Sequence, residues 1–148
     1  MAKVMKFPGY AIVPDSLRNE VSLYGQTVGF GFDLKLRYYR GHYLSCIDEF
    51  VLKIDGKEID PSRISFGING KRLPVPLLSQ LASEFWQVTH LARIQVEQIG
   101  GLKPGEHELD LTLMLRSPYM PNLDPSTPNR YVQIDNCDSG RFTVGMAL

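Results

Sequence analysis

Glu108-Leu109-Asp110-Leu111-Thr112-Leu113-Met114-Leu115-Arg116 carries the clearest secondary-structure signal in this chain. Its four leucines occupy every second position, so all four fall on one face of an extended strand. The preceding Lys103-Pro104-Gly105 has the composition of a type II turn, because proline presets φ and glycine accepts a positive φ. We therefore expect a half-buried β-strand that follows a tight turn and packs its leucine face on a core.

The same two-residue period recurs along the chain. From Gly29 to Tyr38, the even positions are large and apolar, and they predict a second half-buried strand. Asp55-Gly56 and Asn69-Gly70 are two-residue hairpin turns, flanked by strand-like sequence at 50–54, 58–59 and 64–68. Weaker strand patterns cover residues 10–13, 94–98, 131–134 and 141–147.

Two segments depart from this strand pattern. Pro76–Trp86 has apolar residues at helical spacing, and we expect one short helix there. Residues 117–130 contain four prolines and predict a long surface loop, because proline cannot donate to a ladder of hydrogen bonds. The expected fold is all-β: a single domain over residues 1–148, built as an antiparallel β-sandwich of the jelly-roll or immunoglobulin-like kind.

Composition excludes several classes of function. The chain has 148 residues, with 16 basic and 16 acidic side chains and no net charge. A nucleic-acid binder or a polybasic membrane anchor needs a surplus of Lys and Arg, so neither is expected. The two cysteines, Cys46 and Cys137, form no CxxC motif, and we expect both to be reduced in the core. The sequence shows no signal-peptide pattern and no run of apolar residues long enough for a membrane span, which predicts a cytoplasmic protein.

The sequence offers no set of residues with the spacing of an active site. His42, His90 and His107 lie on separate segments without metal-ligand spacing. Asp48-Glu49 are adjacent on a predicted strand and point to opposite faces, and Ser45-Cys46 has no evident base. We therefore expect no catalytic residue and no metal ligand in this chain.

The segment from Leu36 to Phe50 is unusually rich in tyrosine and arginine. These residue types anchor contacts with partners, because each joins a broad apolar surface to a hydrogen-bonding tip. We expect Tyr38 and Trp86 to lie at the edge of the core. The residues predicted to bind a partner are Tyr39, Arg40, His42, Tyr43, Arg116 and Tyr119.

Two other functions fit parts of this pattern. A stand-alone carbohydrate-binding module would stack the tyrosines and Trp86 on sugar rings. A small jelly-roll enzyme would need clustered metal ligands, which the sequence does not show. A sugar-binding assay on the isolated chain separates the module from an accessory subunit.

Several of these segments resemble the β subunit of bacterial C-glycoside deglycosidases. The resemblance runs from about residue 28 to residue 121, and its most specific part is the block from Tyr39 to Ile47. The matching segments are Leu36–Phe50, Val51–Gly56, Ser83–Trp86, Gly100–Leu109 and Pro118–Pro121.

The resemblance implies a non-catalytic β-sandwich subunit that assembles with a separate catalytic alpha subunit. That partner is implied to be a TIM-barrel protein that holds a divalent metal, commonly manganese. The complex is implied to be a carbon–carbon lyase, which releases an aromatic aglycone from a 3-keto-C-glycoside by base-assisted elimination. The family's catalytic residues and metal belong to the alpha subunit, so no catalytic residue, metal ligand or cofactor is carried over to this chain.

Overall fold

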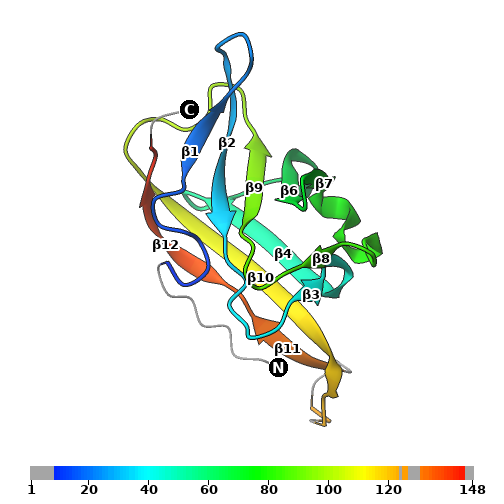
Figure 1. Ribbon diagram of the computed structural model, residues 1–148. Helices are drawn as coiled ribbons and strands as arrows, with labels where there is room; N and C mark the ends of the chain where they lie inside the picture. Colours follow the sequence, from blue (N-terminus) through cyan, green and yellow to red (C-terminus); the bar gives the residue numbers. More distant parts are fainter. Residues whose placement is uncertain (1–8, 124, 127–130, 146–148) are drawn as a thin grey trace.

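The computed structural model describes residues 9–123, 125–126 and 131–145, and it gives only the backbone of Tyr119. Two antiparallel sheets form its body, and they cross in the view of Figure 1. The first sheet has the strand order β1 (Arg18–Val21), β2 (Thr27–Leu34), β9 (Ala92–Glu97), β6 (Ile64–Ile68) and β7 (Lys71–Pro74). The second has the order β11 (Tyr131–Asp135), β10 (Glu106–Pro121), β4 (Ile47–Ile54) and β5 (Lys57–Glu58), with β12 (Asp138–Thr143) also paired to β10.

A third, two-stranded sheet joins β3 (His42–Tyr43) to β8 (Phe85–Trp86) at one edge of the sandwich. The helical content of the described chain consists of three short 3₁₀ segments. These are η1 (Leu44–Cys46), η2 (Pro61–Arg63) and η3 (Val75–Gln80). The predicted all-β sandwich is confirmed.

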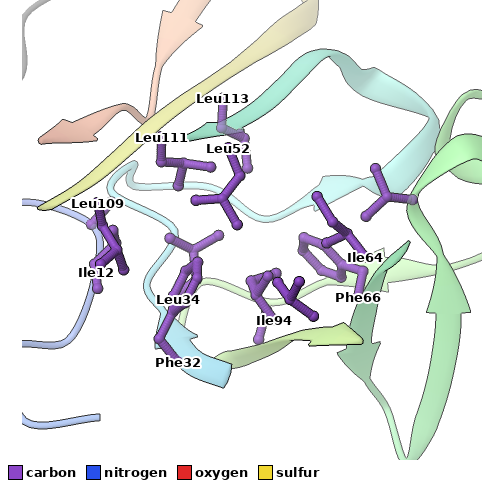
Figure 2. Close-up of a cluster of buried hydrophobic side chains, with 14 of the residues drawn as sticks. Ile12, Phe32, Leu34, Leu52, Ile64, Phe66, Ile94, Leu109, Leu111 and Leu113 are labelled. Carbon is purple, nitrogen blue, oxygen red and sulfur yellow. The ribbon is translucent and has the colours of Figure 1, made fainter. Parts of the chain in front are cut away.

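The core lies between the two large sheets, where the alternating faces of their strands meet (Figure 2). On β10 the four leucines predicted to share a face are all completely buried, at positions 109, 111, 113 and 115. On β2 the side chains of Phe30, Phe32 and Leu34 are also completely buried. Each such side chain contributes about 1.5–3 kcal/mol by leaving water, so the two-residue period accounts for how the sheets associate.

Both predicted hairpin turns are confirmed. Asp55 and Gly56 have φ values of 50° and 83°, and they connect β4 to β5. Asn69 and Gly70 have φ values of 54° and 73° and connect β6 to β7. Positive φ at both central residues is the condition for a type I′ turn, which matches the twist of paired strands.

The predicted helix over residues 76–86 is wrong. The 3₁₀ segment η3 ends at Gln80, and Phe85–Trp86 then forms strand β8. The apolar spacing that suggested one helix is divided between these two elements. Val75 and Leu78 of η3 are buried, and so is Trp86 of β8, which pairs with His42 of β3.

The prolines at 118 and 121 do not end the leucine strand, contrary to the predicted loop over residues 117–130. β10 continues to Pro121. Its pairing with β4 stops at Leu115, and its register with β11 shifts between Arg116 and Pro121. Proline is tolerated there because the second ladder no longer needs its missing N–H. Residues 124 and 127–130 of that predicted loop lie outside the described residues.

Four weaker predictions have mixed outcomes. The strands over 94–98 and 131–134 are confirmed as β9 and β11. Residues 10–13 form only an isolated bridge, through Ile12 and Leu34. β12 begins at Asp138 and ends at Thr143, whereas the predicted strand covered 141–147, of which residues 146 and 147 lie outside the described part.

The cysteine prediction is confirmed, since Cys46 and Cys137 are both free and buried. None of the helices in the described part of the chain has the length and apolar character that crossing a bilayer requires.

Candidate functional site

The connection from β2 to β3 carries the predicted partner-binding residues, and Asn136 holds its first part in place. Asn136 is completely buried just after β11. Its side-chain oxygen accepts a hydrogen bond from the backbone N–H of Arg37 at 2.7 Å. Its side-chain nitrogen donates to the backbone carbonyl of Lys35 at 3.0 Å. Sequence reasoning missed Asn136, because a single asparagine after a strand carries no distinguishing pattern.

A second buried side chain of the β11–β12 junction binds the neighbouring segment. Asp138 is completely buried and lies opposite Leu111 of β10. One of its oxygens accepts hydrogen bonds from the backbone N–H groups of Ala11 and Ile12, at 2.9 and 2.8 Å. Lys35 donates its own backbone N–H to the carbonyl of Ala11 at 2.8 Å. Residues 11–12 and 35–37 are therefore both held by hydrogen bonds to side chains of the β11–β12 junction.

The far end of the connection is fixed by the β3–β8 pair. His42 lies opposite Trp86 and Tyr43 opposite Phe85 in that ladder. A Cβ atom at Gly41 would lie 2.5 Å from the Phe85 ring and 2.6 Å from the Trp86 carbonyl oxygen. Only glycine permits this close approach, and it lets the rings of Tyr43 and Phe85 meet edge to face at 4.9 Å.

Between these two anchors the chain presents a group of exposed aromatic and apolar side chains. Tyr39 is 72% exposed, and Leu91 is 51% exposed. Tyr39, Val88 and Leu91 line one hollow of ≈ 630 Å³, and the Phe85 ring lies against Gly41, the residue after Arg40. We call this the aromatic surface and define it as Tyr39, Arg40, Tyr43, Phe85, Val88 and Leu91.

Stacking interactions order the polar members of the aromatic surface. The Arg40 guanidinium lies 5.6 Å from the centre of the Tyr39 ring. The Tyr39 ring lies in turn 4.5 Å from the ring of Tyr38. Tyr38 is partly buried and packs against the core, as predicted. The exposed Tyr39 ring is thus supported from beneath.

His42 was predicted to bind a partner, and the structure places it beneath the aromatic surface. Its ring is 4% exposed, and its Nδ1 lies 3.2 Å from the Arg40 carbonyl oxygen, to which an Nδ1–H group donates. Burial lowers the pKa of His42, and the Arg40 carbonyl offsets this only in part. His42 is therefore neutral at pH 7, and its contact with the Arg40 backbone helps to order the surface.

Partner binding by Arg116 and Tyr119, the other two residues predicted for that role, stays a prediction. The Arg116 guanidinium donates to the carbonyl oxygen of Ser45 at 2.8 Å and lies 3.3 Å from the Asp48 carboxylate. It is therefore tied to the end of the tyrosine-rich segment rather than to the aromatic surface. The side chain of Tyr119 lies outside the described residues.

Trp86 was predicted as an edge-of-core residue, and this is confirmed. Its side chain is completely buried, its indole N–H donates to the His90 carbonyl at 2.9 Å, and its ring meets Phe66 at 5.2 Å. It cannot stack on a sugar ring, as the carbohydrate-binding alternative required. Phe85, which we had assigned to a helix, is the exposed aromatic residue of this pair.

The titratable groups near the site do not form a metal cage. Among the described residues, no three His, Cys, Asp or Glu side chains lie close enough together to hold a metal ion. His107, far along the chain, bonds to Asp55 and the Lys103 carbonyl, both at 2.7 Å. The geometry of the aromatic surface suits contact with another molecule.

A family model described as C-glycoside deglycosidase beta subunit matches residues 7–119. The chain belongs to that family. A C-glycoside deglycosidase beta subunit from Eubacterium cellulosolvens is 36% identical over 106 residues, which cover 68% of this chain and 72% of the relative. A 3'-dehydrocarminate deglycosidase beta subunit from Microbacterium sp. is 31% identical over 110 residues, covering 74% and 78%. The part that matches the C-glycoside deglycosidase beta subunit family includes the whole aromatic surface, whereas Asn136 lies beyond it.

Proposed function

We propose that this chain is the non-catalytic beta subunit of a C-glycoside deglycosidase and binds the catalytic alpha subunit through the aromatic surface. Membership of the family and the names of its two relatives support the subunit role. The observation that carries the docking site is an exposed aromatic group on a segment that Asn136 and the β3–β8 pair hold rigidly.

The chemistry of the aromatic surface fits a protein partner. Tyrosine and arginine are enriched among the residues that contribute most to binding, because they combine apolar area with hydrogen-bonding groups. A surface that is already ordered before binding loses little conformational entropy on association. An obligate complex buries more than about 2,000 Å² in total, so the contact would extend beyond these six residues.

The proposed alpha subunit is a TIM-barrel protein that holds a divalent metal, with manganese as the expected ion. It would cleave the carbon–carbon bond between the sugar and the aglycone of a 3-keto-C-glycoside. The keto group acidifies a neighbouring C–H of the sugar, so a base can remove that proton and the aglycone can leave by elimination. The beta subunit would contribute by holding loops of the partner's active site in their productive positions.

Co-expression tests this proposal directly. The full chain would be produced together with a candidate TIM-barrel alpha subunit from the same genome, and the size and 3-keto-C-glycoside cleavage of the product would be measured. We expect a stable complex that is active with manganese. Replacing Tyr39 and Tyr43 together by Ser should abolish co-elution, because both rings leave the aromatic surface.

A matched control is available at the turn between β1 and β2. Leu23 and Tyr24 are 102% and 92% exposed and belong to neither the core nor the aromatic surface. Their joint replacement by Ser should leave the complex intact. Full assembly without Tyr39 and Tyr43, or turnover by the purified chain alone without metal, would overturn the proposal.

A further inference from the structure

The face of the first sheet that points away from the core carries a second hollow. Its volume is ≈ 580 Å³, and its lining includes Val28, Arg63, Arg72, Gln95, Glu97 and Ile99. Gln95 lies between Ile94 and Val96, which are buried in the core, so its side chain projects to the outer face. The hollow shares no residue with the aromatic surface.

Glycine keeps the floor of this hollow open. Gly29 lies opposite Glu97 in the β2–β9 ladder. A Cβ atom at Gly29 would lie 2.0 Å from the Val96 carbonyl oxygen, so no side chain can occupy this position. A glycine within a strand often marks a place where another molecule approaches the backbone closely.

Polar groups around the hollow retain unused hydrogen-bonding capacity. Within the described part of the chain, the side chains of Gln95 and Glu97 have no hydrogen-bond partner. The Arg72 Nε–H donates to the Ser65 hydroxyl at 2.7 Å, which orients the guanidinium and leaves its two terminal nitrogens available. Gln95 contributes a donor and an acceptor, Glu97 acceptors and Arg72 donors.

Arg93, also on β9, differs from these residues, because both terminal nitrogens of its guanidinium bind other protein groups. Its two terminal nitrogens bind Glu20 at 2.7 Å and Asp33 at 3.2 Å. A third contact joins it to the Ser16 carbonyl at 3.1 Å. Unlike Arg93, Gln95 and Arg72 keep hydrogen-bonding groups that have no partner among the described residues, and both side chains line the hollow.

The charges of the lining cancel. Arg63, Arg72, Glu20 and Glu97 line the hollow, and Glu20 is paired with Arg93, which also binds Asp33. The guanidinium groups of Arg63, Arg72 and Arg93 are therefore balanced by the carboxylates of Glu20, Asp33 and Glu97. Such a site favours neither an anion nor a cation, because attraction by one set of charges is offset by the other. Val28 and Ile99, which are 45% and 96% exposed, add apolar contact area to this polar lining.

We propose that this hollow binds a saccharide. A neutral pyranose presents hydroxyl groups that both donate and accept, together with a C–H face that can rest on Val28 and Ile99. The volume of the hollow lies within the range of about 300–1,000 Å³ that small-molecule sites occupy. The inference does not depend on the partner-binding role, because the two sites lie on different elements.

The test uses the full chain, isotopically labelled, with its backbone amides followed by NMR. Three methyl pyranosides that differ in hydroxyl configuration would be titrated to concentrations on the order of 10 mM, where weak sites fill. Sodium acetate and tetramethylammonium chloride would serve as anionic and cationic probes. We expect at least one pyranoside to shift the amides of Gly29, Gln95 and Glu97, with no saturable response to either ion.

Substitutions then test whether the pyranoside binds in the hollow lined by Gln95. Gln95→Leu removes the carboxamide at similar size and should weaken pyranoside binding by about tenfold, the effect of one lost hydrogen bond. Gln80→Leu, at an exposed position of η3 outside the hollow, should leave binding unchanged. Thermal unfolding of each variant checks that the fold is intact.

Three outcomes would overturn the proposal. These are no response to any pyranoside, shifts confined to the hollow at Tyr39, or saturable binding of acetate or tetramethylammonium in place of sugar. Loss of partner binding in the co-expression experiment would leave this inference standing, because the NMR titration needs no partner.

Discussion

Asn136 accepts a hydrogen bond from the backbone N–H of Arg37 at 2.7 Å, although 99 residues separate them in the chain. The same side chain donates to the Lys35 carbonyl, so one buried carboxamide satisfies both a donor and an acceptor of the segment leading to the aromatic surface. The position of Tyr39 therefore depends on a residue near the other end of the sequence.

Replacing Asn136 by Ala should destabilise the protein by about 2–5 kcal/mol. The change leaves the part-buried Arg37 N–H and Lys35 carbonyl unpaired, at about 1–2 kcal/mol each, and it also removes packing of a completely buried side chain. Urea denaturation followed by circular dichroism measures this loss. Gln133→Ala, which removes an exposed bond of 3.1 Å to Asp48, is the control and should change stability little. Equal effects of the two substitutions would show that the Asn136 carboxamide does not hold residues 35–37 in place.

Gly41→Ala should disturb the aromatic surface as well as stability. The added methyl group would overlap the Phe85 ring and the Trp86 carbonyl oxygen, and overpacking of this kind costs about 1–3 kcal/mol. We expect weaker binding to the alpha subunit in the co-expression assay, because Phe85 must move. In Gly145→Ala the new atom would meet, among the residues that the structure describes, the Leu17 carbonyl oxygen alone, at 3.4 Å, and this control should bind normally. Normal partner binding by both variants would contradict the expectation.

Trp86→Phe should lower stability by about 1–3 kcal/mol, from the smaller ring and the lost bond to the His90 carbonyl. Circular dichroism during thermal unfolding is the suitable measurement, because Trp86 is the only tryptophan and its fluorescence is lost. Phe85→Leu, on the exposed side of β8, should cost less stability and should instead weaken partner binding. A larger loss of stability in Phe85→Leu would refute this assignment of the two rings.

His107 and Asp55 make stability depend on pH. His107 bonds to Asp55 through Nδ1 and to the Lys103 carbonyl through Nε2, and two acceptors require a doubly protonated ring. Burial acts to lower the pKa of His107, but the Lys103 carbonyl and Asp55 outweigh it and raise this pKa. The bonds from His107 and from the Glu108 backbone N–H lower the pKa of Asp55.

The signs of these shifts define a window of pH. Stabilisation by protonated His107 is complete below about pH 6.5, its value in the unfolded chain, and is lost as pH rises through the higher folded pKa. Stabilisation by ionised Asp55 is present above about pH 3.9 and is lost as pH falls through its lowered folded pKa. The free energy of unfolding of the unsubstituted protein should exceed that of the His107→Gln variant most clearly between about pH 3.9 and pH 6.5. His90→Gln, at an exposed position, is the control, and a difference that does not vary with pH would refute the coupling.

The sequence could predict most strands, because their signal is local. The leucine period of β10 and the Asp55-Gly56 and Asn69-Gly70 turns needed no knowledge of the rest of the chain. β1 was missed, because Arg18–Val21 is a half-exposed edge strand without an apolar period. The error over residues 76–86 arose because the pairing of β8 with β3 joins residues 42 and 44 positions apart in the chain, which no local pattern reveals.

The candidate site was predicted only in part, for the same reason. Composition drew attention to Tyr39, Arg40 and Tyr43, and all three lie at the surface. It could not show that His42 would be covered by its neighbours or that Phe85 would be exposed. Asn136 acts through the backbone of a distant segment, and such a role leaves no trace in the sequence around it.

The positions of Asn136 and Asp138 in the sequence, after β10, have a consequence for synthesis of the protein on the ribosome. A nascent chain that has emerged only as far as β10 already contains every residue of the aromatic surface. It still lacks the carboxamide and the carboxylate that fix residues 35–37 and 11–12. Recognition of the partner should therefore begin only after the chain has been translated beyond Asp138.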